Sequence, residues 1–194
     1  LPVEGRNAEG MNDLVMADEG IRFDASLDKL AGLNPVTEGG VITAGNASQI
    51  TDGAAAVMVC NDAGLKKIQA NPRAEIVSIS VVGDDPVFML TGPIPASIQA
   101  LKTANLTIDD MDLYEVNEAF APVPLAWAEE LKADRSKLNV NGGAMALGHP
   151  LGATGAKLMT TLLHEMERRE AKYGLQAICE GGGTANATIL KIIN

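Results

Sequence analysis

Aromatic residues are scarce in this 194-residue chain, which holds one Trp, two Tyr and three Phe, or 3% of the sequence. Surfaces that stack bases or sugars are built from several aromatic rings, so the sequence disfavours carbohydrate and single-stranded nucleic-acid binding. The formal net charge is −10 and no run of Lys and Arg occurs. A nucleic-acid surface needs basic patches. We therefore expect no nucleic-acid partner.

Cysteine and histidine are also scarce, with Cys60, Cys179, His149 and His164 alone. Two cysteines are too few for a disulfide framework, which favours a reducing compartment, the cytoplasm. The spacing of these four residues matches no zinc pattern, so we predict no metal site. The sequence has no apolar run of membrane-spanning length and no charged-then-apolar start, and we expect no membrane contact.

Several common catalytic motifs are missing as well. "GAMALG" does not follow the dinucleotide-binding fingerprint, no P-loop lysine pattern occurs, and no G-x-S-x-G elbow is present. What the chain does contain is a globular composition, 46% hydrophobic and 21% charged, with 20 glycines. Many of those glycines fall inside motifs, which directs attention to their neighbours.

Strands and helices are predicted to alternate from about Val41 onwards. Strands are predicted at residues 54–61, 74–83, 110–117, 175–179 and 187–193. Helices are predicted at residues 62–70, 94–106, 118–131 and 152–174, the last one ended by Gly174. This order indicates a layered α/β domain with helices packed on a sheet. Cys60 closes the apolar run "AAAVMVC" and is predicted to be a buried structural thiol.

The longest predicted helix carries an apolar stripe, formed by Leu158, Leu162, Leu163 and Met166. Trp127 and Met166 are predicted to lie in the core. His164, beside two glutamates, is predicted to be a surface residue.

Residues 1–42 differ from the rest, with eight Asp and Glu against three Lys and Arg and little strand pattern. "SLDKLAGL" at 26–33 predicts a short helix with Ser26 as N-cap and Gly32 or Asn34-Pro35 as its stop. We interpret the segment as the tail of an insertion or lid.

The first of three chemistry-bearing stretches is "EVNEAFA", residues 115–121. Asn117 follows a predicted strand and precedes a predicted helix. Asparagine is a preferred N-cap, so one interpretation is a helix cap. The other is that its amide holds a water or a substrate oxygen.

The second stretch is "NVNGGAMALGHPLGATGA", residues 139–156. His149 is held between Gly148 and Pro150 ahead of the longest helix. A neutral imidazole has one donor and one acceptor nitrogen and an unperturbed pKa near neutrality. His149 is therefore either a structural loop residue or a group that takes a proton from a thiol or donates to an oxyanion.

The third stretch is "CEGGGTAN", residues 179–186. Cys179 ends a predicted strand and precedes three glycines, whose successive N–H groups can form an anion-binding nest. A thiol beside such groups can have a lowered pKa and act as a nucleophile or proton carrier. The alternative is a buried thiol next to a glycine-rich hairpin.

Together these stretches resemble the thiolase family, the acyltransferases that make or split 3-ketoacyl-CoA. The matching runs, in chain order, are "ITAGNASQITDGAAAVMV", "GPIPA", "YEVNEAFA", "NVNGGAMALGHPLGATGAKLMTTLLHE" and "CEGGGTANAT". They cover nearly the whole chain. The ending "CEGGGTANATIL" departs from the commoner C-x-G-G-G-M-G and resembles thiolases that degrade fatty acids or sterol side chains.

The resemblance implies a role for each matching residue. Cys179 resembles the acid/base cysteine that moves the α-proton of the acetyl group. His149 resembles the histidine that activates the nucleophilic cysteine and donates to the thioester oxygen. Asn117 resembles the asparagine that holds a water in the same oxyanion hole, and the N–H of Gly181 resembles a donor of the second hole. Claisen chemistry needs such a base and such donors.

The resemblance also implies acyl-CoA or CoA as substrate, with no covalently bound cofactor. Arg22 resembles a residue that touches the nucleotide end of CoA. The residues that resemble the wall of the pantetheine channel are Ala47, Ser48, Met89, Ala119 and Phe120.

One part of the family's machinery is missing, because thiolases carry the acyl group on a second cysteine of the N-terminal half. Cys60 sits in a different setting, so the chain resembles only the C-terminal part of a thiolase. It is expected to hold the end of the insertion (1–42), the last strand and helix of the N-terminal half-domain (43–70) and the C-terminal half-domain (71–194) of a duplicated five-layer α/β fold.

We therefore expect an N-terminal thiolase half, in the same or a separate chain, as a partner. The family implies a homo-oligomer, a dimer or tetramer. The chain alone is expected to be inactive. The alternatives are a natural split subunit and a non-catalytic CoA-binding or scaffold module.

Overall fold

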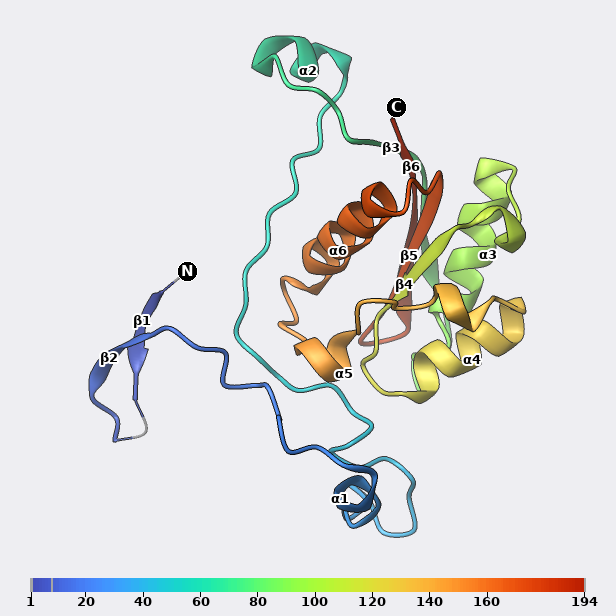
Figure 1. Ribbon diagram of the computed structural model, residues 1–194. Helices are drawn as coiled ribbons and strands as arrows, with labels where there is room; N and C mark the ends of the chain where they lie inside the picture. Colours follow the sequence, from blue (N-terminus) through green and yellow to red (C-terminus); the bar gives the residue numbers. More distant parts are fainter. Residues whose placement is uncertain (1, 8, 194) are drawn as a thin grey trace.

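A four-stranded mixed sheet lies at the centre of the computed structural model, which describes residues 2–7 and 9–193 (Figure 1). The strands are β3 (Ala74–Gly83), β4 (Leu113–Val116), β5 (Tyr173–Glu180) and β6 (Thr184–Ile192). Their order across the sheet is β3-β6-β5-β4. β4 runs parallel to β5, and the other two pairs are antiparallel.

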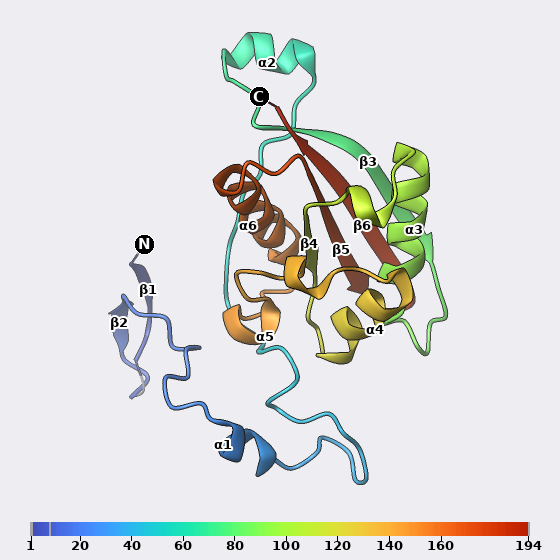
Figure 2. The same cartoon turned by 45° about the vertical axis from the view of Figure 1, so that its right-hand side comes forward.

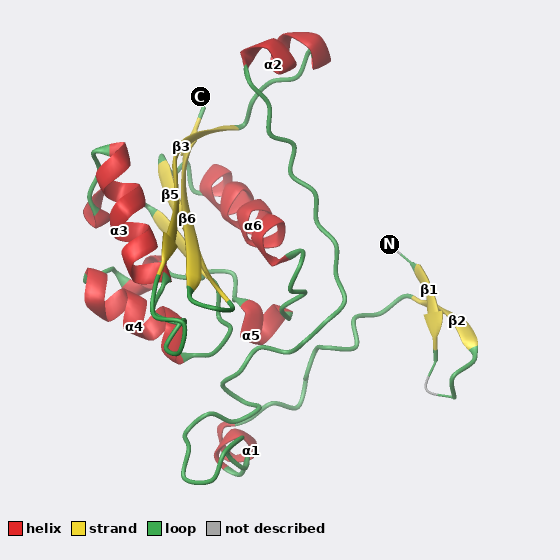
Figure 3. Cartoon of the chain, turned by 180° about the vertical axis from the view of Figure 1, so that it is seen from behind, coloured by secondary structure: helices red, strands yellow, loops and turns green. Residues whose placement is uncertain are grey.

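Helices cover both faces of this sheet. α3 (Pro93–Ala104) and α4 (Pro122–Leu131) pack on one face, and α6 (Thr154–Arg168) lies on the other beside the short α5 (Ala144–Leu147) (Figure 2). The view from behind shows the same three layers edge-on (Figure 3). One 3-10 turn, η1 (Ile108–Asp110), lies between α3 and β4, and a second, η2 (Arg135–Lys137), lies between α4 and α5. The predicted layered α/β domain is confirmed.

A buried indole organises the packing of α3 and α4. Trp127 is fully buried, its ring meets Tyr114 edge-on with centroids 5.3 Å apart, and its Nε1 donates to Ser97 Oγ at 2.8 Å. Ser78 and Ser80 of β3 donate to main-chain carbonyls of α3 at 2.9 and 2.6 Å. Buried polar groups are thereby paired, as a dense core requires. The core placement predicted for Trp127 is correct.

The opposite face is closed by the apolar stripe of α6. Leu113, Leu162 and Met166 are buried together there, and a side chain at Gly174 would collide with Met166. Met166 is a core residue and His164 is exposed, as predicted. The predicted end of this helix at Gly174 is wrong: α6 ends at Arg168, and Gly174 belongs to β5, where its missing side chain lets α6 approach the sheet.

The segment before β3 departs most from the sequence prediction. Residues 51–61 form neither helix nor strand, and the predicted strand at 54–61 is therefore wrong. Cys60 is exposed, which contradicts the predicted buried thiol. Among the strands of the described residues, none pairs with this run, and a strand requires a neighbour because its N–H and C=O groups need partners. The helix that follows, α2 (Asp62–Ile68), is present, with Asn61 as N-cap.

The N-terminal segment holds one predicted and one unpredicted element. α1 (Leu27–Ala31) has Ser26 as its N-cap, accepting from Lys29 N, and Gly32 at its end, as expected. β1 (Val3–Arg6) and β2 (Asn12–Val15) form an antiparallel hairpin that the sequence pattern missed, because most of its residues are exposed on both faces. Of the helices in the described ranges, none is long and apolar enough to cross a membrane.

Candidate functional site

A short stretch of the N-terminal segment, residues 46–49, lies between the loop after β4 and the histidine loop. Ser48 donates through both its N and its Oγ to Ala119 O, each at 3.1 Å, and Ala47 forms a bridge with Phe120. Gln49 O accepts from His149 N at 2.8 Å. Hydrogen bonds of the main chain thus join residues 46–49, the loop after β4 and the histidine loop into one continuous surface, called the wall below.

Asn117 lies at the carboxyl end of β4 and is 1% exposed. Its Nδ2 is 3.4 Å from His149 Nε2, and its Oδ1 has no hydrogen-bond partner among the residues that the structure describes. The helix-cap interpretation is wrong, because α4 begins five residues later at Pro122 without a side-chain cap. A buried amide oxygen without a donor is costly, and a water or ligand donor is what satisfies it.

The imidazole of His149 is fixed from its other side by α6. Nδ1 lies 2.6 Å from Thr154 Oγ1, and that hydroxyl donates its proton to Pro150 O at 3.0 Å. A hydroxyl has one proton, so Thr154 accepts from His149 and Nδ1 carries the hydrogen. In the neutral ring Nε2 is then an unprotonated acceptor that faces Asn117. Burial, and next the positive charge of Lys157, lower the pKa of His149.

The loop from 139 to 148 is held by side chains around β4. Asn139 receives a hydrogen bond from Val116 N at 2.8 Å and donates to Val116 O and Glu118 Oε1. Glu118 Oε2 accepts from Met145 N at 3.0 Å, and a side chain at Gly143 would collide with this carboxylate. The second glutamate of "EVNEAFA" therefore shapes the loop that leads to the histidine.

A buried carboxyl group lies next to this site. Glu115 is 1% exposed and is the register partner of Gln176 on β5. Within residues 2–7 and 9–193, Glu115 Oε2 and Gln176 Oε1 both lack hydrogen-bond partners. Burial, with a smaller effect of the negative charge of Glu118, raises the pKa of Glu115 to about 8. Glu115 therefore carries a proton near neutral pH.

Cys179 and Gly181 lie at the carboxyl end of β5, beside the end of β4. Asn117 N donates to Ala177 O at 3.0 Å, so the main chain of Asn117 lies two residues from Cys179 along the strand. The side chain of Cys179 packs with the cluster under α3 and α4, whereas Asn117 faces the α6 side. No hydrogen bond within the described ranges joins Cys179 to His149 or Asn117. Their convergence on one substrate stays a prediction.

The thiol of Cys179 is half-buried, and burial raises its pKa. This is the opposite of the lowering expected from the glycine N–H groups. Gly182 and Gly183 adopt φ of +83° and +82° and close the β5–β6 hairpin, while Gly181 is exposed. The hairpin packs on the loop before α3 through a bond from Asp84 N to Gly183 O. A protonated thiol is suited to carrying a proton rather than to spontaneous nucleophilic attack.

Two of the sequence-predicted CoA-contacting residues lie apart from this wall. Met89 is half-buried in the turn before α3, with φ +28°. Arg22 is exposed in the segment that precedes α1.

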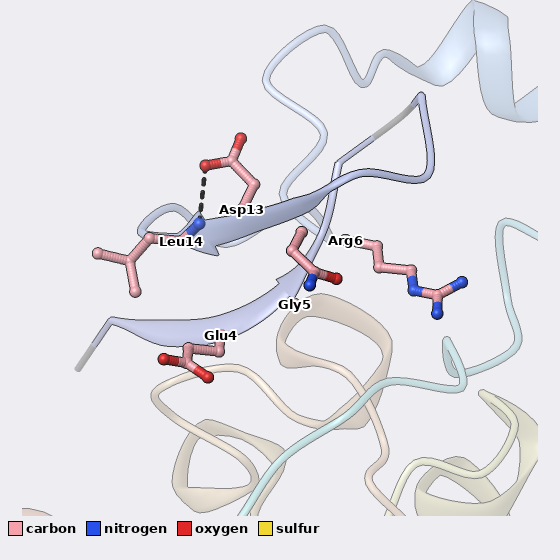
Figure 4. A pocket seen from close by; sticks show the side chains of 6 residues that line it. Glu4, Gly5, Arg6, Asp13 and Leu14 are labelled. Atoms are coloured by element: carbon pink, nitrogen blue, oxygen red, sulfur yellow. Dashed lines mark hydrogen bonds between the residues drawn. The ribbon is translucent and has the colours of Figure 1, made fainter.

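The surface next to the histidine loop is hollowed. This hollow is lined by two short runs, 51–55 and 150–153. A separate depression on the N-terminal hairpin is lined by Glu4, Gly5, Arg6, Asn12, Asp13 and Leu14 (Figure 4). That hairpin and α5 are drawn apart from one another in the views from the front and from behind (Figures 1 and 3). No cluster of three His, Cys, Asp or Glu suited to a metal is found within the described ranges.

Sequence reasoning missed four polar residues around the histidine: Glu115, Glu118, Thr154 and Lys157. The position of Glu115 inside the otherwise apolar strand run "LYEV" was a signal that its carboxyl group is buried. Thr154 and Lys157, three residues apart at the start of the longest helix, share a face toward the histidine loop.

Comparison with known proteins identifies the family. Residues 70–192 match the model of the thiolase C-terminal domain, and residues 1–63 match that of the thiolase N-terminal domain. The steroid 3-ketoacyl-CoA thiolase FadA6 of Mycobacterium tuberculosis is 60% identical over 90% of this chain and 42% of its own length.

Solved structures agree with this result. The acetyl-CoA acetyltransferase of Bacillus anthracis superposes with a TM-score of 0.90 at 39% identity, over 100% of this chain and 49% of its own. Human mitochondrial 3-ketoacyl-CoA thiolase in complex with CoA has a TM-score of 0.85 at 45% identity, over 93% of this chain and 46% of its own. The chain thus spans less than half the length of these relatives.

Proposed function

Because this chain belongs to the thiolase family, we propose that it supplies the C-terminal half of an active site that transfers acyl groups between CoA thioesters. The reaction is cleavage of a 3-ketoacyl-CoA or condensation of acetyl-CoA. One observation carries the proposal: the buried amide of Asn117 faces Nε2 of His149 and keeps an unsatisfied oxygen. This pair can hold a water or a thioester oxygen at the end of β4.

His149 is the proton acceptor for the nucleophile in this proposal. Its Nε2 carries no hydrogen in the neutral ring, because Nδ1–H is donated to Thr154, and its lone pair faces Asn117. Nε2 takes the proton of the nucleophilic thiol, whose sulfur then attacks the thioester carbon. Once protonated, Nε2 donates to the thioester oxygen on which negative charge develops.

Cys179 is proposed as the acid/base group for the α-carbon. Its raised pKa keeps the thiol protonated at rest. The thiol gives that proton to the departing CoA sulfur, and the thiolate left behind takes the α-proton of the acetyl group. The main-chain N–H of Gly181 is proposed as a donor of the second oxyanion hole.

The substrate is proposed to be an acyl-CoA, with CoA leaving or entering as the free thiol. The bridge between residues 46–49 and 119–121 gives Ala47, Ser48, Ala119 and Phe120 a shared surface for the pantetheine arm. Met89 would extend that surface and Arg22 would meet the nucleotide end. The steroid 3-ketoacyl-CoA thiolase with 60% identity favours a degradative role on steroid-derived or fatty acyl chains.

The nucleophile is proposed to come from a thiolase N-terminal half, in the same or a separate chain. The other cysteine, Cys60, comes two residues before the start of α2, and α2 lies well apart from α5 (Figure 1). A distance of that kind prevents it from attacking a thioester held at His149. Assembly of the complete enzyme into a dimer or tetramer belongs to the same proposal.

Activity of the chain with and without an N-terminal half tests this proposal. We expect the purified 194-residue chain to show no cleavage of acetoacetyl-CoA, and co-expression with a thiolase N-terminal half to yield CoA-dependent cleavage. His149→Ala in the complemented enzyme should lower kcat by about 100-fold or more, as loss of a general base does. Turnover by the chain alone would contradict the missing nucleophile, and full activity of His149→Ala would contradict the site.

A further inference from the structure

Lys157 lies in the first turn of α6, three residues after Thr154. Its Nζ donates to two main-chain carbonyl oxygens, that of Leu147 at 3.1 Å and that of Gly148 at 2.8 Å. These two residues come directly before His149. Gly148 has φ +83°, and a side chain there would collide with Thr51. One ammonium group therefore holds the tight turn that directly precedes His149.

Among the described residues, the two carbonyl oxygens that accept from Lys157 receive no main-chain hydrogen bond. Leu147 is the last residue of the four-residue α5, and the last carbonyls of a helix have no partner within it. A cation at a helix C-terminus satisfies them and is favoured electrostatically. Removing the ammonium would free the peptide next to His149, while Thr154 and Gln49 O would still hold the residue from its other sides.

Lys157 also acts on the imidazole through its charge. Its positive charge is the second cause, after burial, that lowers the pKa of His149. Three carboxyl groups act on the charge of Lys157: Glu115 of β4, Glu118 of the following loop and Asp18 of the N-terminal segment. Glu115 is protonated near neutral pH, so this buried carboxyl does not cancel the ammonium charge there.

From this arrangement we propose that Lys157 is a positioning residue for His149: it fixes the two preceding carbonyls and places a positive charge near the ring. The inference deepens the proposed function, in which His149 is the base. Its first test is independent of activity. Lys102→Met on α3, which lies on the other face of the sheet, is the matched control (Figure 2).

The test is a pH titration of the two histidine Cε1–H resonances in the full 194-residue chain by NMR, assigned with His149→Gln. We expect Lys157→Met to raise the pKa of His149, Lys157→Arg to keep it near the parent value, and Lys102→Met to leave it unchanged. Circular dichroism checks that each variant is folded. An unchanged or lower pKa of His149 in folded Lys157→Met overturns the proposal.

A second variant covers the case in which Lys157→Met does not fold. Lys157→Gln keeps N–H donors for the two carbonyl oxygens and removes the positive charge, so it should also raise the pKa of His149. An unchanged or lower pKa of His149 in folded Lys157→Gln overturns the proposal.

Kinetics of the complemented enzyme give the functional consequence. Lys157→Met should lower kcat roughly 10- to 100-fold with a smaller change in KM, because a misplaced base slows the chemical step. The acidic limb of its pH–rate profile should move to higher pH, and Lys157→Arg should restore both. If the unsubstituted complemented enzyme shows no thiolase turnover, the proposed function fails, while the NMR titration still decides the role of Lys157.

Discussion

At the scale of single residues, the site depends on buried polar atoms whose pairing is incomplete. Among the described residues, Asn117 Oδ1, Glu115 Oε2 and Gln176 Oε1 are buried without partners, and they lie on or directly after the adjoining strands β4 and β5. Buried polar atoms are otherwise almost always paired in folded proteins. The unpaired oxygen of Asn117, beside His149, marks the end of β4 as a place where a water or a ligand completes the structure.

Glu115 gives a pH-dependent stability that can be measured. Its pKa is raised from 4.5 to about 8 in the folded chain, so its proton stabilises the fold below about pH 4.5, and that contribution is lost as pH rises toward 8. We expect Glu115→Gln to remove a slope of up to about 1.4 kcal/mol per pH unit from the free energy of unfolding. Urea denaturation between pH 5 and 8 measures this slope, because that range lies between the ordinary and the raised pKa of Glu115.

The control for that experiment is Glu75→Gln, which removes an exposed carboxylate from β3. It should leave the pH slope of the parent chain in place. A Glu115→Gln chain with the parent slope would show that Glu115 is ionised in the folded chain near neutral pH.

The sequence predicted some of these residues and missed others for physical reasons. His149 and Asn117 stand out because a reactive side chain is flanked by glycine, proline or the end of a strand. Thr154, Lys157 and Glu115 are ordinary helix and strand residues in sequence. Their importance comes from the close packing of α6 against the loop and against β4, which one-dimensional periodicity does not contain.

At the scale of elements, the core helices and strands and the two short exposed helices α1 and α2 were predictable, whereas the exposed hairpin β1–β2 and the irregular run 54–61 were not. The strand predicted at 74–83 matches β3, and the long amphipathic helix matches α6 through Arg168. The run at 54–61 has the composition of a strand, yet it is irregular and exposed. Strand composition describes a surface that fits a sheet, and pairing depends on a neighbour elsewhere in space.

The packing of α3 on α4 can be tested through the buried indole. Ser97→Ala would leave Trp127 Nε1–H without an acceptor and should lower the free energy of unfolding by about 1–3 kcal/mol. In a Trp127→Phe background the same substitution should cost less, because the donor is gone. Chemical denaturation of the four chains forms the cycle, and equal costs in both backgrounds would contradict this account of the hydrogen bond.

At the scale of the whole molecule, the chain corresponds to part of the length of its thiolase relatives. It spans 42% of the mycobacterial thiolase, and residues 1–63 match a domain model different from that of residues 70–192. The apolar run 54–59 is exposed over its whole length. Exposed strand-like runs are unusual on a protein that acts alone, and they mark surfaces where another sheet pairs.

If residues 51–61 pair with a strand of an N-terminal thiolase half, their amide hydrogens become protected when that half is added. In the chain alone, their amide hydrogens should exchange quickly, since the described segment makes no strand pairing. Addition of the N-terminal half should protect them, while β5 and β6 stay protected in both states. Hydrogen–deuterium exchange read by mass spectrometry measures this. Fast exchange in an active complemented enzyme would contradict pairing of this segment.

The proposed active site requires Cys179 and His149 to act on one bound thioester. The direct measurement is exchange of the acetyl α-hydrogens of acetyl-CoA with deuterated water, catalysed by the complemented enzyme and followed by NMR. The account predicts exchange with the parent chain and a fall of about 100-fold or more with Cys179→Ala. Equal exchange by the parent and Cys179→Ala enzymes would contradict it.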